Sequence, residues 1–379
     1  MSSLIASVNY IETVNEVTML GALRDAQQHN VKAVFILCCD NADEDLSFFN
    51  QCLAEFDIPI FGGVFPGLLS DGKVYEKGAL IVGFAVDVNV SLHANMQNAA
   101  EQEFSPTINL DCPSIMVLVD GLANNIDYMT QQIFHLVGHG ANVFGGGAGS
   151  LSFEQKPCII CNQGIFADAL LMISLDQPFE LAIGHGWEKL AGPFLASQAQ
   201  GNQINSLNFQ SALSVYQNVV SQHTELDFNS TPFFEIAKTF PFGIERLDDD
   251  MLVRDPITTE QQSLICVGNI PENTMLYILH GEADKLISAA SNSVKTALSI
   301  GVQNREFGDG ILFDCISRKL FLTGDYLNEL TAIQDNFSSG THLVGVLALG
   351  EIASGKAGMV NFHNKTAVTG LSYRNKNSD

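Results

Sequence analysis

The sequence FGGGAGS at residues 144–150 resembles the sequence FGGVFPG at residues 61–67, and this similarity indicates an internal repeat. Each glycine run follows an apolar, strand-like segment and a helix-like segment, and each precedes a polar excursion and a further apolar strand. The two sets of flanking segments are VKAVFILCCD, residues 43–56 and residues 79–86 for the first run, and SIMVLVDG, residues 124–137 and residues 169–175 for the second. The pattern predicts a β-α-β-loop-β unit that occurs twice.

The glycines of the second run have two interpretations. Nucleotide binding of the Walker type is excluded, because the run lacks the Gly-Lys-Ser/Thr end of a phosphate loop and opens no recognisable helix. In the first interpretation, the glycines permit positive φ and close backbone approach at the end of a buried strand. In the second, Gly146 and Gly147 contact a ligand, since open α/β sheets bind ligands outside the carboxyl ends of their strands.

The apolar pattern is lost in QAQGNQINSLN, which predicts a domain boundary near residue 195. We expect an N-terminal domain over residues 1–195, a second mixed α/β domain over 196–373, and a disordered tail at 374–379. The predicted fold class is α/β, with duplicated β-α-β units in the N-terminal domain. The second half is expected to contain helices at 283–299 and 326–337, a helix-like spacing over 209–220, and strands in MLVRDPI, SLICVG, MLYILHG, GILFDC and KLFL.

Composition narrows the class of protein. The chain has 379 residues, 46% of them hydrophobic, and a formal net charge of −24. This charge repels phosphate backbones and anionic headgroups, so neither nucleic acid nor a membrane is expected as a partner. The N-terminus lacks a signal-peptide pattern and no run of 18 apolar residues occurs, which predicts a cytoplasmic protein with reduced, buried cysteines.

Several landmarks, taken in order, resemble the FIST family. FGGGAG and the Gly-Trp of GHGWEKLAGP resemble its N-terminal module, and VRDPI, IPENTMLYIL, FDCISR, GEI and FHNKT resemble its C-terminal module. Asp314 departs from the pattern, because the family more often has a small residue before the cysteine of FDCISR. The resemblance implies a bacterial signal-transduction sensor that binds a small ligand such as an amino acid.

A narrower branch of the family resembles the chain more closely, through HGWEKLAGP, FFEIAKTFPFGI and VRDPI. Its members bind haem b, sense nitric oxide and regulate a separate histidine kinase or a cyclic-di-GMP synthase or phosphodiesterase, with biofilm regulation as the output. The resemblance therefore implies a haem-based nitric-oxide sensor. The alternative is a FIST sensor of a small ligand such as an amino acid, without haem, and a non-sensing scaffold is a third reading; a homodimer stays open.

Haem needs an axial donor, commonly a neutral imidazole. His185 is the first candidate for the iron, because it follows an apolar strand and stands beside Trp187, a flat aromatic wall; a hydrogen-bonded structural histidine is the alternative. His139, His280 and His363 are further candidates. We expect Arg254 and Arg318 to bind the haem propionates or a ligand carboxylate, because a guanidinium group can donate two parallel hydrogen bonds to a carboxylate.

Catalysis is not expected. The chain has no G-x-S-x-G elbow, and Cys315 with Arg318 has no base evident in the sequence. Nor does the chain carry a kinase, methyl-accepting or cyclase segment, which suits a sensor that acts on a separate protein.

Overall fold

The computed structural model shows the predicted repeat as a four-stranded unit. The structure describes residues 3–29, 31–40, 45–101, 103–246, 251–300, 305–355 and 358–375. In the first unit, two fully buried parallel strands lie side by side, and antiparallel strands extend the sheet on one side. Its elements are β1 (Ile5–Ile11), α1 (Glu16–Gln27), β2 (Ala33–Cys39), β3 (Ile60–Phe65) and β6 (Ala79–Phe84), in the order β1-β6-β2-β3.

The second unit repeats this order, so the predicted duplication and the mixed α/β class are confirmed. Its central strands are parallel like those of the first unit. The elements are β7 (Val88–Ala94), β8 (Ser114–Asp120), α3 (Ile126–Val137), β9 (Asn142–Ala148) and β12 (Ala169–Leu175), in the order β7-β12-β8-β9.

A third copy, which the sequence did not reveal, lies at the C-terminal end of the chain. It has the same parallel central pair and the same antiparallel neighbours. Its elements are β13 (Phe179–Gly184), α6 (Ala283–Ser299), β22 (Arg305–Cys315), α7 (Ile316–Leu322), α8 (Tyr326–Gln334), β23 (Leu343–Ala348) and β26 (Ala367–Asn375).

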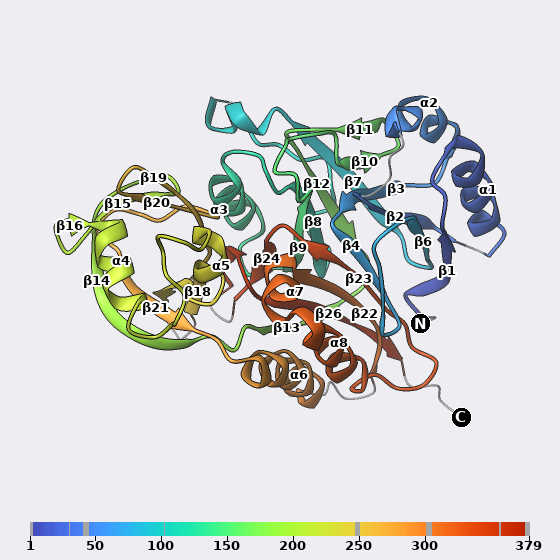
Figure 1. The fold of residues 1–379 in the computed structure, drawn as a ribbon. Coiled ribbons are helices and arrows are strands. Elements are labelled where there is room, and N and C mark those ends of the chain that lie inside the picture. Colours follow the sequence, from blue (N-terminus) through green and yellow to red (C-terminus); the bar gives the residue numbers. More distant parts are fainter. Residues whose placement is uncertain are drawn as a thin grey trace.

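The three units exchange hairpins in a cycle. Each unit sends the hairpin after its glycine-bearing strand to the sheet of another unit, so each sheet has six strands. The hairpin of the first unit pairs with β23, that of the second with β3, and that of the third with β9, and Figure 1 shows β4 beside β23. The exchanged strands are β4 (Gly67–Ser70) and β5 (Lys73–Tyr75), β10 (Ile159–Cys161) and β11 (Gly164–Phe166), and β24 (Glu351–Ser354) and β25 (Val360–His363).

One glycine in each unit explains the glycine runs. A Cβ atom on Gly62 would lie 1.9 Å from the Ile36 carbonyl oxygen, and one on Gly145 would lie 1.8 Å from that of Val117. Gly345 occupies the same register in the third unit, with 2.1 Å to the Leu312 carbonyl oxygen. The parallel strands approach so closely that only glycine fits, which supports the structural interpretation of these runs.

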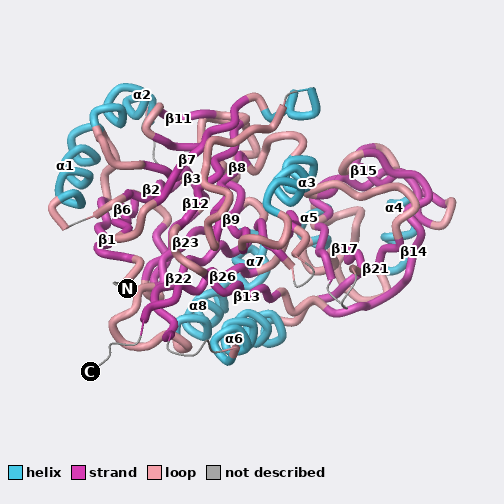
Figure 2. The backbone as a smooth tube through the Cα atoms, turned by 180° about the vertical axis from the view of Figure 1, so that it is seen from behind, coloured by secondary structure: helices cyan, strands magenta, loops and turns pink. Residues whose placement is uncertain are grey.

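Residues 188–280 form an insert between β13 and α6 of the third unit. The insert leaves and rejoins the repeats through paired strands, where Glu188 lies opposite His280. Figure 2 shows it as a separate lobe beside the three repeats, which we call the body, and it has a hydrophobic core of its own. Its elements are β14 (Glu188–Gln200), β15 (Gln203–Leu207), β16 (Gln210–Ser211), α4 (Ala212–Val220), α5 (Phe233–Ala237), β17 (Phe242–Glu245), β18 (Met251–Arg254), β19 (Pro256–Glu260), β20 (Ser263–Cys266) and β21 (Met275–His280).

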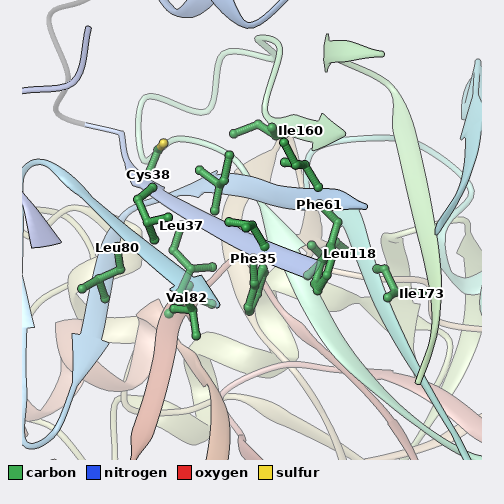
Figure 3. Packing of buried hydrophobic residues seen from close by; sticks show 14 of the residues in the cluster. Phe35, Leu37, Cys38, Phe61, Leu80, Val82, Leu118, Ile160 and Ile173 are labelled. Carbon is green, nitrogen blue, oxygen red and sulfur yellow. The ribbon is translucent and has the colours of Figure 1, made fainter. Parts of the chain in front are cut away.

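The main core joins the sheets of the body. Phe35 and Phe61 stack with ring centroids 5.0 Å apart on neighbouring strands of the first unit. Figure 3 shows them beside Leu118 and Ile173 of the second unit, and all four side chains are fully buried. Burial on both faces explains why these strands are continuous apolar runs rather than alternating patterns.

Some local predictions were wrong. KLFL, predicted as a strand, lies in α7, which starts where β22 ends and carries the buried Arg318. The helix expected over 43–56 is broken into short turns at Leu46–Phe48, Phe49–Cys52 and Leu53–Glu55, and residues 43–44 lie outside the described part. Arg374 and Asn375 of the expected tail belong to β26, whereas residues 376–379 lie outside the described part.

Three further predictions concern the cysteines, membrane-spanning helices and the domain boundary. All eight cysteines are free and buried, as expected. Among the described helices, none combines the length and the apolar character needed to cross a membrane. The domain boundary near residue 195 stays a prediction; β14 passes through this position, and strands from both sides of it pair in the sheets of the body.

Candidate functional site

One opening, lined by both polar and apolar side chains, lies where the insert meets the body. This interface cavity has a volume of about 580 Å³. Its walls come from residues 121–127 of the second unit, residues 315–317 and Asn364 of the third unit, and Asp255 and residues 266–269 of the insert. A ligand in this cavity therefore contacts three parts of the fold at once, and a cavity between lobes is a common place for small-molecule sites.

Arg254 of the insert holds these walls together. Its Nη2 donates to Asp127 Oδ1 of α3 at 2.9 Å, and its Nη1 donates to the Phe362 carbonyl of β25 at 2.7 Å. Further bonds reach the carbonyls of Val253 and Asn269. The Arg254 side chain is 2% exposed, and burial lowers its pKa although Asp127 acts in the opposite direction. All of these acceptors belong to the protein itself, so the Arg254 guanidinium holds the cavity walls in position.

The adjacent Asp255 faces the cavity and is tied to the third unit. Ser317 Oγ donates to its Oδ2 at 2.8 Å, and Lys365 Nζ lies 3.2 Å from its Oδ1. Lys365 is fully buried and also donates to the Lys238 carbonyl of the insert at 3.0 Å. Burial raises the pKa of Asp255, while Lys365 and Ser317 lower it. The buried carboxylate is thereby retained beside the cavity by a cation and a hydroxyl group.

Two further features of the wall have unused hydrogen-bonding capacity. Asn364 is 2% exposed, its Nδ2 donates to the His363 carbonyl, and its Oδ1 has no partner. Helix α3 begins at the cavity, and its N-cap Asn125 does not cap it, because the Asn125 amide donates instead to the carbonyls of Met96 and Gln97. A buried acceptor without a partner is costly, and an uncapped helix N-terminus favours an anion.

The third unit buries charges where its sister units are apolar. Asp314 occupies the register of Cys38 and Val119, and Glu351 occupies that of Leu68 and Ile159. Both carboxyl groups are fully buried. Burial, with a smaller contribution from the Glu329 charge, raises the pKa of Asp314 to about 8, and burial raises that of Glu351 well above its ordinary value. Such perturbed groups cluster at functional sites, which directs attention to the third unit.

A second opening, the hairpin cavity, lies at the carboxyl ends of β2 and β8. Its volume is about 560 Å³, and its walls include Asp40, Asp45, Asp120, Ser150 and Lys156. Ser150 Oγ donates to Asp40 Oδ2 at 2.7 Å, and Asp120 accepts from three donors of the chain. These carboxylates are already engaged within the fold.

The structure brings three of the residues nominated from the sequence together behind the interface cavity. Arg318 Nη1 donates to the carbonyls of His185 and Lys365 at 2.7 Å and 3.1 Å, and Trp187 Nε1 donates to the same Lys365 carbonyl at 3.1 Å. Arg318 also pairs with Glu329 and bonds the Leu286 carbonyl, and it is fully buried. The guanidinium is thus occupied by protein groups.

Gly146 and Gly147 are not among the residues that line either cavity. A Cβ on Gly146 would come within 2.8 Å of the Phe313 ring, and one on Gly147 within 2.3 Å of the Leu349 carbonyl oxygen. These glycines allow β9 to pack closely against the third unit. Their role as ligand contacts stays a prediction from the sequence.

The histidines, the commonest axial donors to haem iron, line neither cavity. All nine histidines lie in the described part of the chain, and none of them lines the interface cavity or the hairpin cavity. His185 accepts a bond from the Trp187 amide at its Nδ1, at 3.0 Å. His280 packs on Phe240, His139 packs on Phe134, and His363 is 2% exposed on β25. Neither cavity offers an imidazole to an iron, so these two sites do not fit a histidine-ligated haem.

Across the described ranges, no group of three or more His, Cys, Asp or Glu side chains is placed to hold a metal ion. The cavity-lining thiols of Cys315 and Cys266 are buried, and burial raises the pKa of both. They are therefore protonated and poor metal ligands.

Sequence reasoning missed most of the cavity wall. Arg254 was nominated, but its partner Asp127 lies far away in the sequence and no local signal linked them. Asn364 and Lys365 stand in FHNKT, a segment noted for its family resemblance and for His363, but not for these two residues. Lys365 stands between two polar residues, Asn364 and Thr366, so no local signal marked it as the buried partner of Asp255.

Comparisons with known proteins agree with the sequence landmarks. Residues 32–210 match the model of the FIST N domain, and residues 212–354 match that of the FIST C domain. No curated protein matches the chain. The boundary between the two matches falls within the insert, at the end of β16. The chain is therefore a FIST-domain protein, with sensory FIST N and FIST C domains that together span most of its length.

Proposed function

We propose that this chain is a sensor that binds a free amino acid in the interface cavity. The proposal rests on two features of one cavity. The N-terminus of helix α3 is uncapped, and the buried oxygens Asn364 Oδ1 and Asp255 Oδ1 have hydrogen-bonding capacity left. An amino acid carries a carboxylate and an ammonium group on one carbon, which are complementary to these two features.

The first turn of α3 is the place for the carboxylate. Backbone N–H groups at a helix N-terminus bind anions, and the helix dipole adds to the attraction. Among the described residues, no lysine or arginine side chain lines the cavity, so the helix end supplies the positive potential there. Arg254 fixes this turn through Asp127.

The ammonium group is placed at Asn364 and Asp255. Asn364 Oδ1 lacks a donor, and the Asp255 carboxylate is 1% exposed at the same wall. An ammonium group supplies three N–H donors, and a hydrogen bond to a charged group contributes about 1.5–3 kcal/mol. Binding would thereby satisfy the acceptor that the free protein leaves unpaired.

The location of the cavity also suits a sensor. A ligand that contacts both lobes stabilises their closed arrangement, since binding shifts a protein towards the conformation with which it interacts better. The change would be passed to a separate protein, for which the family resemblance implies a histidine kinase or a cyclic-di-GMP enzyme.

Thermal melting with each of the twenty amino acids tests the proposal. A ligand at 100 times its Kd raises the free energy of unfolding by about 2.7 kcal/mol, which gives a clear rise in Tm. Asn364→Leu should weaken binding about 10- to 100-fold, since it removes one charge-assisted bond. Asn361→Leu, on strand β25 just before Asn364 but outside the cavity wall, is the matched control and should bind normally. A flat screen with all twenty amino acids contradicts the proposal.

The haem reading rests on the family branch that the sequence resembles, and the cavity walls do not favour it. It predicts a Soret band that shifts with nitric oxide and is lost in His185→Ala, with unchanged far-UV circular dichroism. The amino-acid proposal predicts no specific band after hemin titration. One absorption spectrum of wild type and variant therefore separates the two readings.

A further inference from the structure

We infer that the amino acid sensed in the interface cavity has a large apolar side chain, an inference that rests on the proposed function. One part of the cavity wall is built from apolar side chains of the body and the insert. They include Ile126, Phe234, Ile257, Leu320, Leu349 and Phe362. At about 580 Å³, the cavity also has room beyond what the two charged groups of an amino acid occupy.

The rim of the cavity is apolar too. Leu151 and Phe153 line it from the loop between β9 and β10, and they are 37% and 58% exposed. A ligand that covers large apolar side chains gains binding free energy, because apolar surface is removed from water. The rim thus favours a ligand whose apolar part reaches the cavity mouth.

Hydrogen bonds to Asp40 and Asp120 of the body hold this loop in place. Ser150 Oγ donates to Asp40 Oδ2 at 2.7 Å and accepts from the Ser152 amide at 3.0 Å, and the Phe153 amide donates to the Ser150 carbonyl. Gln155 Nε2 donates to Asp120 Oδ2 at 2.8 Å. Leu151 and Phe153 are therefore presented to the cavity on an anchored loop, which limits the ordering that ligand binding requires.

The polar groups of the wall leave no cation for a charged side chain. Asp127 is engaged by Arg254 and by the Asn269 amide, and the Asn202 amide donates to the Cys266 carbonyl. An acidic ligand side chain would have no positive partner among the described wall residues. Leucine, methionine and phenylalanine are the ligands that match, whereas aspartate and glutamate are not.

Calorimetric titration of the full chain tests this inference with a graded series. L-Phenylalanine should bind at least about 100-fold more tightly than glycine, since a pocket discriminates about 10-fold or more for each methylene. L-Serine and L-glutamate should bind as weakly as glycine. 3-Phenylpropionate and 2-phenylethylamine, which each lack one charged group, should both bind more weakly than phenylalanine.

Phe153→Ala tests the rim directly. It should weaken phenylalanine binding about 10-fold and leave glycine binding unchanged, because only the larger ligand reaches the rim. Phe209→Ala is the matched control, since Phe209 is also an exposed phenylalanine with positive φ but lies outside the cavity. Far-UV circular dichroism and Tm confirm that both variants fold.

The outcomes are distinguishable. If phenylalanine and glycine bind equally, or if Phe153→Ala weakens both alike, the apolar-ligand inference is overturned while the amino-acid site stands. If no amino acid binds at all, the proposed function fails and the inference fails with it. A 100-fold preference for phenylalanine over glycine that Phe153→Ala reduces and Phe209→Ala preserves supports both the amino-acid site and the apolar-ligand inference.

Discussion

Replacing Arg254 by methionine should detach the insert from the body. Methionine keeps the length and the apolar packing of the side chain but removes its charge and all of its donors. The substitution leaves the Asp127 carboxylate without its cation, and the carbonyls of Val253, Asn269 and Phe362 without their donor.

The magnitude follows from burial. Breaking a buried ion pair by removing one partner costs about 3–5 kcal/mol, because an uncompensated charge stays buried. The Asp127 side chain is 18% exposed and keeps the bond from the Asn269 amide at 2.7 Å, which places the loss at the lower end. We therefore expect the free energy of unfolding to fall by about 3 kcal/mol.

Equilibrium urea unfolding, followed by far-UV circular dichroism, measures this loss, provided that the transition is single. Lys32→Met is the control, because the Lys32–Asp87 pair is 49% and 73% exposed and such surface pairs contribute about 0–1 kcal/mol. If Arg254→Met costs no more than the control, Arg254 does not hold the cavity walls and the reasoning from its four bonds is refuted.

Two further predictions concern the repeats and the buried carboxyl groups. Gly145→Ala should lower Tm strongly or prevent folding, because its Cβ would lie 1.8 Å from a carbonyl oxygen. The control, Gly21→Ala on the open surface of α1, should stabilise the protein by about 0.5–1 kcal/mol. Equal Tm values for the two variants would count against the close approach of the parallel strands. Asp314→Asn should gain Tm relative to wild type as the pH rises from 6 to 9. The pKa of Asp314 is raised to about 8 in the folded protein, so folded wild type holds a proton that the unfolded chain releases near pH 4, and its stability falls as the pH rises towards 8. The uncharged amide does not titrate, and a pH-independent difference in Tm between the two proteins would show that Asp314 ionises normally.

The sequence predicted two of the three repeats, and the reason lies in particular residues. The first two copies share Phe-Gly-Gly and have short connections, so their order was readable. The third copy keeps only Gly345 of that signature, and the insert separates its strand β13 from α6. The hairpin exchange had no sequence signal, because strand pairing between distant segments leaves no local pattern.

The candidate site was predictable only in part. Arg254 and Arg318 were nominated because guanidinium groups bind carboxylates, and both proved to be buried and engaged by the chain itself. Asn364 was not recognised, since its importance comes from an unpaired Oδ1 at a cavity that forms only when three distant segments meet. Burial and partnership are tertiary properties, which residue type and spacing do not encode.

We propose that the interface cavity binds an amino acid between α3 and Asn364. A crystal structure of the chain with the amino acid that raises Tm most tests it directly. We expect ligand density in this cavity, with the carboxylate at the backbone N–H groups of the first turn of α3 and the ammonium group within hydrogen-bond distance of Asn364 Oδ1. Density in the hairpin cavity instead, or a ligand bound with its two charged groups reversed, would contradict it.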